Sequence, residues 1–311
     1  MERMATVTRD KSNNLMRWAT RASVSVAATL VAAKAVAWWL SDSVAMLGSM
    51  TDSGLDLMAS LVTLFAVRTA LLPPDEDHRF GHGKAEALAG LFQAAIMSGS
   101  AVFLLLESIN HVAVPHPVTQ STLVMVVSGV AILLSLALVA FQSYVVRHTG
   151  SLAVAGDHLH YKGDLLLNLS VIFAAWATAA GFDYADGAFG ILIALYILYG
   201  AKEIALPAVD MLMDKELGLE DREKIFNLAM GNPHVRGLHE LKTRMSGRDL
   251  FIQMHIEVDG DMTVQDAHFV ADEVEAMIGE AFPDSEVLIH VDPPSLLSDQ
   301  LTVKELGKIG E

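Results

Sequence analysis

Two pairs of ionisable side chains occur in segments of the chain that are otherwise apolar. Asp52 and Asp56 lie in MLGSMTDSGLDLMAS, and His160 and Asp164 lie in GDHLHYKGDLLLN. The members of each pair are four residues apart, so in a helix they share one face and lie one turn apart. Three carboxylates and one imidazole that converge would form a four-coordinate site of oxygen and nitrogen ligands, which suits Zn²⁺.

The apolar surroundings favour one shared site over four separate surface positions. A charged side chain in the middle of a membrane helix costs about 2.5–3.5 kcal/mol, so such groups are expected to face one another. The alternative is structural, because a single intramembrane aspartate could pair with Lys34 or Lys162. Asp157 and His158, near the start of the second segment, are expected to lie at the membrane interface rather than to bind the metal. The chain has no cysteine, which excludes disulfides and thiolate metal sites, and the ligand types argue against Cu(I).

The elements that would carry these pairs are long apolar helices. The chain has 311 residues, is 52% hydrophobic and only 19% charged, and its mean hydropathy is +0.41. Six apolar segments are each about 20 residues or longer, enough to cross a hydrocarbon core of about 30 Å as a helix. The first is too long, and its flanks are unsuitable, for a cleaved signal peptide. The segments are Trp18–Leu40, Val44–Leu72, Ala85–Ile109, Thr119–Val146, Ala153–Ala180 and Tyr184–Leu206.

The placement of lysine and arginine predicts the orientation of these helices. Basic residues occur in the N-terminal arm, in the connections after the second and fourth segments and at the end of the sixth. The other three connections contain none. Both termini are therefore expected in the cytoplasm. The basic residues concerned are Arg3, Arg9, Lys11, Arg17, Arg79, Lys84, Arg147 and Lys202.

The polar C-terminal third carries most of the net charge of −16. This acidity argues against a nucleic-acid partner, which calls for a basic surface. The pattern of LEDREKIFNLAMG is helical, GLHELKTRMS and DLFIQMHIEV alternate as strands, TVQDAHFVADEVEAMIGEAF is an amphipathic helix and SEVLIHV is a third strand. This order predicts an αββαβ domain with a small sheet. We therefore expect a membrane α-helical protein with a cytoplasmic α/β domain. The expected parts are a cytoplasmic arm (1–14), six transmembrane helices (15–206), the α/β domain (207–294) and a tail (295–311).

Two further groups of residues outside the apolar segments could bind metal. Asp75, His78 and His82 lie within eight residues beside glycines, and three ligands would leave one position open, as in a labile zinc site. A solvated charged loop is the alternative interpretation. The C-terminal domain contains a second set, although a single histidine on a strand is more often a packed residue than a ligand. That set is His239, His255, His268, His290 and Asp292.

The chain resembles the cation diffusion facilitator family, and within it the bacterial zinc–proton antiporters. The resemblance covers residues 15 to 294 and rests on TDSGLD, HYKGD, DEDHRFGHGKAE and GLHELKTR…FIQMHIEVDG…LIHVDPP. It implies a tetrahedral transport site at Asp52, Asp56, His160 and Asp164 that carries Zn²⁺ and Cd²⁺ and, in related members, Fe²⁺.

The same resemblance implies further features. The loop residues Asp75, His78 and His82 would form a second metal site, and the C-terminal set would form a two-metal cluster near a dimer interface, with Asp292 bridging. Lys84 and Asp214 would form a salt bridge between the protomers of a homodimer. The protein would lie among the lipids of a bacterial inner membrane.

The function predicted from these observations is efflux of divalent metal from the cytoplasm in exchange for protons. Metal and protons compete for carboxylate and imidazole atoms, and an imidazole titrates near pH 6.5. The chain has no P-loop, so transport without ATP is expected, by a secondary transporter rather than an enzyme. An intramembrane metalloprotease is disfavoured because His239–Glu240 has Thr243 where H-E-x-x-H needs histidine. A membrane-tethered metal sensor is the other alternative.

Overall fold

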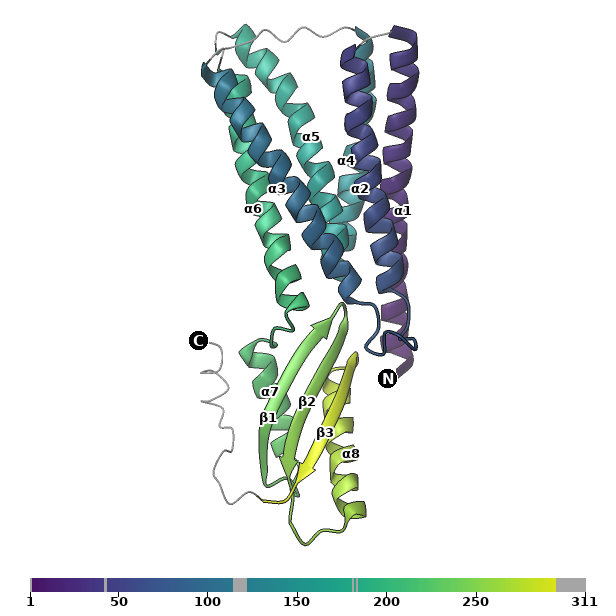
Figure 1. Ribbon diagram of the computed structural model, residues 1–311, viewed down its shortest axis with the longest axis vertical. Helices are drawn as coiled ribbons and strands as arrows, with labels where there is room; N and C mark the ends of the chain where they lie inside the picture. Colours follow the sequence, from purple (N-terminus) through teal and green to yellow (C-terminus); the bar gives the residue numbers. More distant parts are fainter. Residues whose placement is uncertain (1, 42–43, 114–121, 181, 183, 295–311) are drawn as a thin grey trace. The chain divides into compact units, whose positions relative to one another are not determined.

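The computed structural model describes residues 2–41, 44–113, 122–180, 182 and 184–294 (Figure 1). The predicted tail at 295–311 therefore lies outside the described residues. The chain divides into two compact units. One comprises Thr6–Pro73 and Lys84–Val209, and the other Met1–Ala5, Pro74–Gly83 and Asp210–Glu311.

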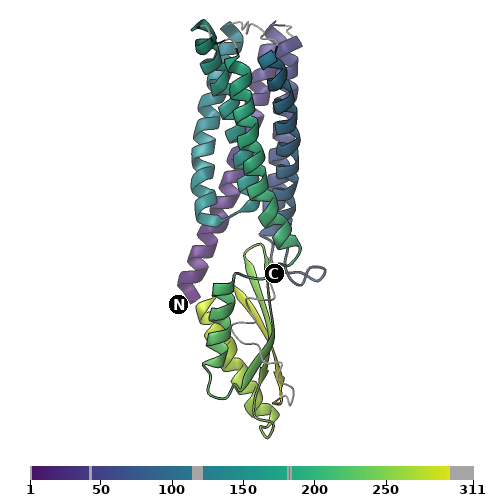
Figure 2. The same ribbon diagram turned by 90° about the vertical axis from the view of Figure 1, so that its left-hand side faces the viewer.

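The first unit consists of long helices that run alongside one another in both views (Figures 1 and 2). Six long helices are described, and five of them are long and apolar enough to cross a membrane. The exception is α5, which carries Asp157, Lys162 and Asp164 in its first half. The helices are α1 (Glu2–Ser41), α2 (Val44–Ala70), α3 (Lys84–Ala113), α4 (Thr122–Thr149), α5 (Leu152–Ala179) and α6 (Ala185–Leu212). The predicted helical membrane domain is confirmed.

Helix α5 is the element around which the others pack, and this positions its polar residues. It contacts α2, α3 and α4. Leu159 on α5 joins Met97 of α3 and Ile197 of α6 in one buried apolar cluster. Because the first half of α5 is enclosed by neighbouring helices, its ionisable groups face protein rather than lipid, as intramembrane polar residues generally do.

A close contact between α3 and α6 depends on glycine at position 187. A Cβ atom added there would lie 2.6 Å from the Ser108 carbonyl oxygen and 2.6 Å from Val112 Cγ2. Small residues of this kind let membrane helices approach closely.

We expect Gly187→Ala to lower the free energy of unfolding by about 1–3 kcal/mol, because the added methyl group overlaps backbone atoms. The measurement is thermal unfolding of the detergent-purified protein. Gly99→Ala is the matched control, since a Cβ at this α3 position would meet no atom within 4 Å. Equal melting temperatures for the two variants would contradict the prediction.

The second unit contains a three-stranded sheet covered on one face by two helices (Figures 1 and 2). Strands β1 and β2 pair antiparallel, and β2 and β3 pair parallel through a crossover that includes α8. The predicted αββαβ order is confirmed. The elements are α7 (Leu219–Met230), β1 (Gly237–Ser246), β2 (Asp249–Glu257), α8 (Val264–Ala281) and β3 (Ser285–Asp292).

Alternation along β2 separates the core of this unit from its polar face. Ile252, Met254 and Ile256 are fully or almost fully buried and pack with Val274 and Ile278 of α8. Residues at the intervening positions of β2 point to the opposite face, because successive side chains of a strand alternate. His255 belongs to this second face, which the helices leave uncovered.

Candidate metal sites

The intramembrane site is formed where α2 meets α5. His160 Nε2 lies 2.9 Å from Asp56 Oδ1 and 3.5 Å from Asp164 Oδ2. The ligand atoms of these three residues all lie within 4.8 Å of one another, close enough to bind a single ion. His160 is 8% exposed, so its imidazole is inside the protein. Three of the four residues predicted for this site are therefore brought together.

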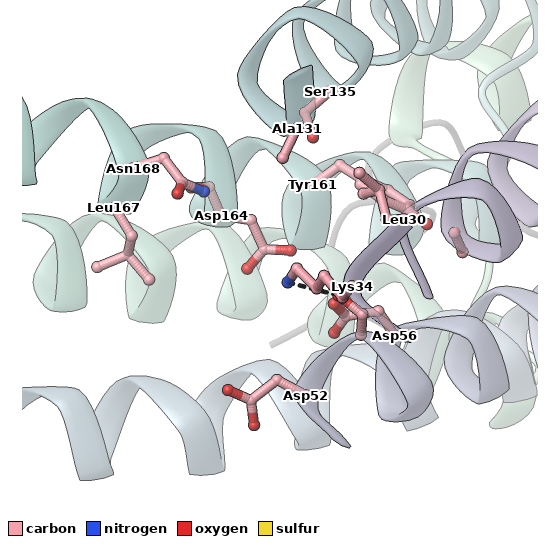
Figure 3. A pocket seen from close by; sticks show the side chains of 12 residues that line it. Leu30, Lys34, Asp52, Asp56, Ala131, Ser135, Tyr161, Asp164, Leu167 and Asn168 are labelled. Atoms are coloured by element: carbon pink, nitrogen blue, oxygen red, sulfur yellow. Dashed lines mark hydrogen bonds between the residues drawn. The ribbon is translucent and has the colours of Figure 1, made fainter. Parts of the chain in front are cut away.

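Asp52 lies one helical turn from Asp56 and lines the same pocket, but its carboxylate is outside this close group and is exposed. The pocket has a volume of about 240 Å³, and Asp52, Asp56 and Asp164 all line it (Figure 3). The pocket is large enough for a metal ion, and its lining is rich in the oxygen ligands that borderline and hard cations accept.

One contact from a neighbouring helix and one within α5 involve the residues of this group. The Nδ1 atom of His160 lies 3.2 Å from the sulfur of Met97 on α3, so both ring nitrogens have a partner. Asn168 donates to the backbone carbonyl of Asp164 at 2.8 Å, one turn farther along α5. Neither contact was predicted from the sequence. The contact with Met97 depends on which helices are neighbours, and that of Asn168 depends on its side-chain rotamer.

A second buried polar cluster lies one turn before His160 and is centred on Asp157. The Asp157 side chain is 1% exposed, so it lies at neither a lipid nor a water surface. It accepts a hydrogen bond from Gln142 Nε2 at 2.6 Å and one from Ser60 Oγ at 3.3 Å. Ser60 also contacts Ser23 at 2.9 Å and the hydroxyl of Tyr161 at 3.0 Å. The cluster thus connects α1, α2, α4 and α5.

Asp157 was predicted to lie at the membrane interface, but two features of the sequence indicate its buried position. Asp157 and His160 are three residues apart and so lie on the same side of α5. Gln142 interrupts an apolar helix, and such polar residues generally face the interior of a bundle.

The three loop residues predicted to bind metal also lie together, in the second unit. Asp75 Oδ1 lies 3.4 Å from His78 Nδ1, and Asp75 Oδ2 lies 3.2 Å from His82 Nε2. The backbone N–H of His78 donates to Asp75 at 2.7 Å, and this bond lowers the pKa of the Asp75 carboxyl. An ionised carboxylate beside two imidazoles is suited to a divalent cation.

The loop is held against the hairpin that joins β1 and β2. Phe80 packs edge-on against Phe251 with ring centroids 5.4 Å apart. The guanidinium of Arg244 lies 4.6 Å from the Phe80 ring centroid and 4.9 Å from that of Phe251. Gly83 packs directly against the backbone of Ser246, where a Cβ atom would overlap it. These contacts give the loop site a defined position within its unit.

The register of the sheet gathers the C-terminal histidines. His239 pairs with His255 across β1 and β2, and His255 pairs with His290 across β2 and β3. Asp292 contacts all three imidazoles, at 3.3 Å, 2.9 Å and 3.2 Å respectively. The hydrogen bond with His255 lowers the pKa of the Asp292 carboxyl, so it stays ionised at mildly acidic pH.

Glu257 is a neighbour of this cluster that the sequence analysis did not single out. Its side chain is 2% exposed, and its Oε1 atom lies 3.7 Å from His239 Nδ1. The alternation of β2 could have indicated it, since Glu257 follows His255 by two residues and so shares its face.

His268 is not brought together with the other four residues within the described chain. It lies on α8, in the helical layer, and its imidazole contacts Asp272 at 3.6 Å while remaining largely exposed. The assignment of His268 as a metal ligand stays a prediction.

The salt bridge predicted between Lys84 of one protomer and Asp214 of the other also stays a prediction. Asp214 pairs with Arg244 at 3.4 Å within its own unit, and Lys84 is the first residue of α3.

We expect Asp292→Ala to weaken zinc binding by the C-terminal cluster at least about 100-fold, because Asp292 contacts every imidazole of the cluster and loss of a ligand should cost more than loss of a supporting residue. The measurement is the zinc content per chain of the full-length protein after dialysis against micromolar zinc. Glu275→Ala is the control, since Glu275 is an exposed residue of α8, in the helical layer. An unchanged zinc content in Asp292→Ala would rule out the cluster, and a reduced content in His268→Ala would place His268 among the ligands.

Comparison with known proteins identifies the family. The model of the cation efflux transmembrane domain matches residues 20–213, and that of the cation efflux protein cytoplasmic domain matches residues 217–294. The cation-efflux pump FieF of Shewanella oneidensis is 44% identical over 278 residues, covering 89% of this chain and 94% of its own. FieF of Klebsiella pneumoniae is 42% identical over 276 residues, and the match covers 89% of this chain and 92% of that protein.

A solved structure of CzrB in its Zn form is 34% identical and covers 27% of this chain and 98% of its own, with a TM-score of 0.26. The family models and the FieF relatives together span nearly all of the described chain. The helical unit lies almost wholly within the first match and the α/β unit contains the second, while the loop Pro74–Gly83 falls in the first match but in the α/β unit. The chain is therefore a multi-pass membrane protein that belongs to the cation diffusion facilitator family of cation efflux transporters.

Proposed function

We propose that this protein exports Zn²⁺ from the cytoplasm in exchange for protons, with Cd²⁺ and Fe²⁺ as further substrates. The observation that carries the proposal is the grouping of Asp56, His160 and Asp164, whose ligand atoms lie within 4.8 Å of one another inside a helical membrane unit. Asp52, which lines the same pocket, is the fourth ligand. The donor set of carboxylates and imidazole fits Zn²⁺ in tetrahedral coordination.

The exchange of metal for protons follows from the chemistry of these ligands. A carboxylate or imidazole binds metal only in its deprotonated form, so each metal bound displaces protons from the same atoms. Facing the cytoplasm, the site takes up Zn²⁺ and gives up protons. Facing outward, it takes up protons and gives up Zn²⁺. The proton gradient then drives export, provided that the site opens to only one side at a time.

The ligands come from two different helices, which gives alternating access a structural basis. Asp52 and Asp56 belong to α2, whereas His160 and Asp164 belong to α5. A tilt of one helix against the other would change the ligand distances and the side from which the pocket is reached.

The protein is assigned to the inner membrane of a bacterium as a homodimer with both termini in the cytoplasm. The distribution of lysine and arginine supports this orientation. The loop cluster at Asp75 and the cluster at Asp292 would bind regulatory or structural zinc on the cytoplasmic side. A membrane-tethered sensor would need only these two clusters, and the intramembrane group argues against it.

The test is counterflow in proteoliposomes that contain the full-length protein under an imposed pH difference. Zn²⁺, Cd²⁺, Fe²⁺ and Mn²⁺ are offered in turn, while a pH dye reports proton movement. Zinc uptake that requires the pH difference and is matched by opposite proton movement is expected. Zinc binding without any flux would instead support the sensor, and flux without proton movement would contradict exchange.

A further inference from the structure

Lys34 of α1 enters the pocket that the site carboxylates line (Figure 3). Its ammonium donates to the Ser53 hydroxyl oxygen at 2.7 Å and to the Ser49 carbonyl oxygen at 3.2 Å. Both acceptors belong to α2, and Ser53 adjoins Asp52 in the sequence and is 2% exposed. The ammonium is thus held against the helix that carries two of the carboxylates.

This arrangement differs from that of a lysine that reaches the membrane surface. A snorkelling lysine extends its stem along apolar surface so that its ammonium reaches water. The Lys34 ammonium instead makes two hydrogen bonds to a neighbouring helix, and Lys34 lines the same pocket as Asp56 and Asp164. Lys34 therefore belongs electrostatically to the site, although it cannot be a metal ligand.

Among the four proposed ligands and the residues that line the pocket, the charges balance only when Lys34 is counted. Three ionised carboxylates contribute three negative charges, and a neutral imidazole contributes none. A divalent ion leaves one negative charge, which the ammonium cancels. A net charge in the low-dielectric interior of a membrane protein is costly, so the neutral combination is favoured.

We propose that Lys34 is the charge-balancing residue of the transport site, which makes the site neutral when it holds one divalent ion and thereby allows that ion to leave. The inference rests on the proposed function. Without the ammonium, the loaded site would keep one negative charge, so it would hold Zn²⁺ more tightly and release it more slowly. Lys34 is thus a residue of the transport site that sets how tightly the site holds its divalent ion, without being a ligand itself.

The decisive variant is Lys34→Gln, which removes the charge but keeps a side-chain donor for Ser49 and Ser53. Loss of one nearby positive charge is expected to lower the Kd for Zn²⁺ at least about tenfold and to lower the maximal flux at least about tenfold. Lys34→Arg keeps the charge and is expected to restore both values to within about threefold of the wild type. Thermal unfolding of each purified variant identifies any loss of folding.

Lys162→Gln is the matched control, because Lys162 also lies in a membrane helix but its ammonium lies 5.1 Å from the Tyr196 ring centroid and does not line the pocket. Zinc affinity is measured by titration of the detergent-purified full-length protein, and flux in proteoliposomes. Tighter binding in Lys34→Gln alone supports the proposal. Equal or weaker binding in Lys34→Gln, or the same shift in Lys162→Gln, overturns it.

The two proposals fail in distinguishable ways. If the wild type shows no zinc–proton exchange, the proposed function fails, and the binding titrations still decide the role of Lys34. If exchange occurs and Lys34→Gln changes neither affinity nor flux, the charge-balancing role fails alone. Should Lys34→Gln not fold, Lys34→Met provides a second neutral side chain of similar length for the same titration.

Discussion

Zinc flux through the Asp164→Asn variant is expected to fall at least about 100-fold below that of the wild type. Asparagine has nearly the same shape as aspartate but lacks its charge, so the pocket keeps its volume and loses one anionic ligand. Replacing a residue that only supports a ligand already costs 10- to 100-fold in metal affinity, and loss of a ligand should cost more. The measurement is zinc uptake into proteoliposomes under an imposed pH difference.

Asp186→Asn is the matched control for this variant. Asp186 lies in the first turn of α6 and does not line the pocket, so its flux should stay within about twofold of the wild type. Asp52→Asn extends the test, because Asp52 lines the pocket without joining the close group. Normal flux in Asp164→Asn would refute the site. Normal flux in Asp52→Asn alone would reduce the ligand set to the three residues that lie together.

The second large effect is expected at the buried cluster around Asp157. Gln142→Leu leaves the Asp157 carboxyl without its shortest hydrogen bond in a region that water does not reach. An unsatisfied buried acceptor costs about 1–3 kcal/mol, so the melting temperature of the purified protein should fall clearly. Asp157→Leu should cost a similar amount, because it leaves the Gln142 amide and the Ser60 hydroxyl without this partner.

The double variant Gln142→Leu/Asp157→Leu should be less destabilised than the sum of the single variants by about 1–3 kcal/mol, since both polar partners are then removed together. Ser98→Ala combined with Asp157→Leu is the control. The Ser98 hydroxyl donates to the Ala94 carbonyl oxygen of its own helix, so these two changes should add. Additive losses for Gln142 and Asp157 would show that their hydrogen bond does not stabilise the bundle.

Local patterns in the sequence predicted the elements closely. The alternation in DLFIQMHIEV predicted a strand, which the structure has as β2 over Asp249–Glu257. The amphipathic pattern in TVQDAHFVADEVEAMIGEAF predicted a helix, which the structure has as α8 over Val264–Ala281. The spacing of four residues correctly placed Asp52 with Asp56, and His160 with Asp164, on shared helix faces. These features depend only on residues near one another in the chain, so they can be predicted from the periodicity of the sequence.

Contacts between elements could not be obtained in this way. Periodicity shows which face of α2 carries Asp56, but only the packing of α5 against α2 places His160 2.9 Å away. Lys34 was considered as a structural partner for an aspartate, whereas the position of α1 decided that its ammonium enters the pocket. Asp157 was expected at an interface, and helix packing enclosed it instead.

The sequence by itself thus determined the chemistry that is available and the face from which each group projects. The tertiary structure alone decided which groups meet. It selected Asp56, His160 and Asp164 as a close group, gathered three C-terminal histidines on Asp292, and left His268 in the helical layer. The physical reason is that the periods of helices and strands arise from local backbone geometry. Contacts between residues distant in the chain depend instead on which whole faces of helices and sheets are buried against one another.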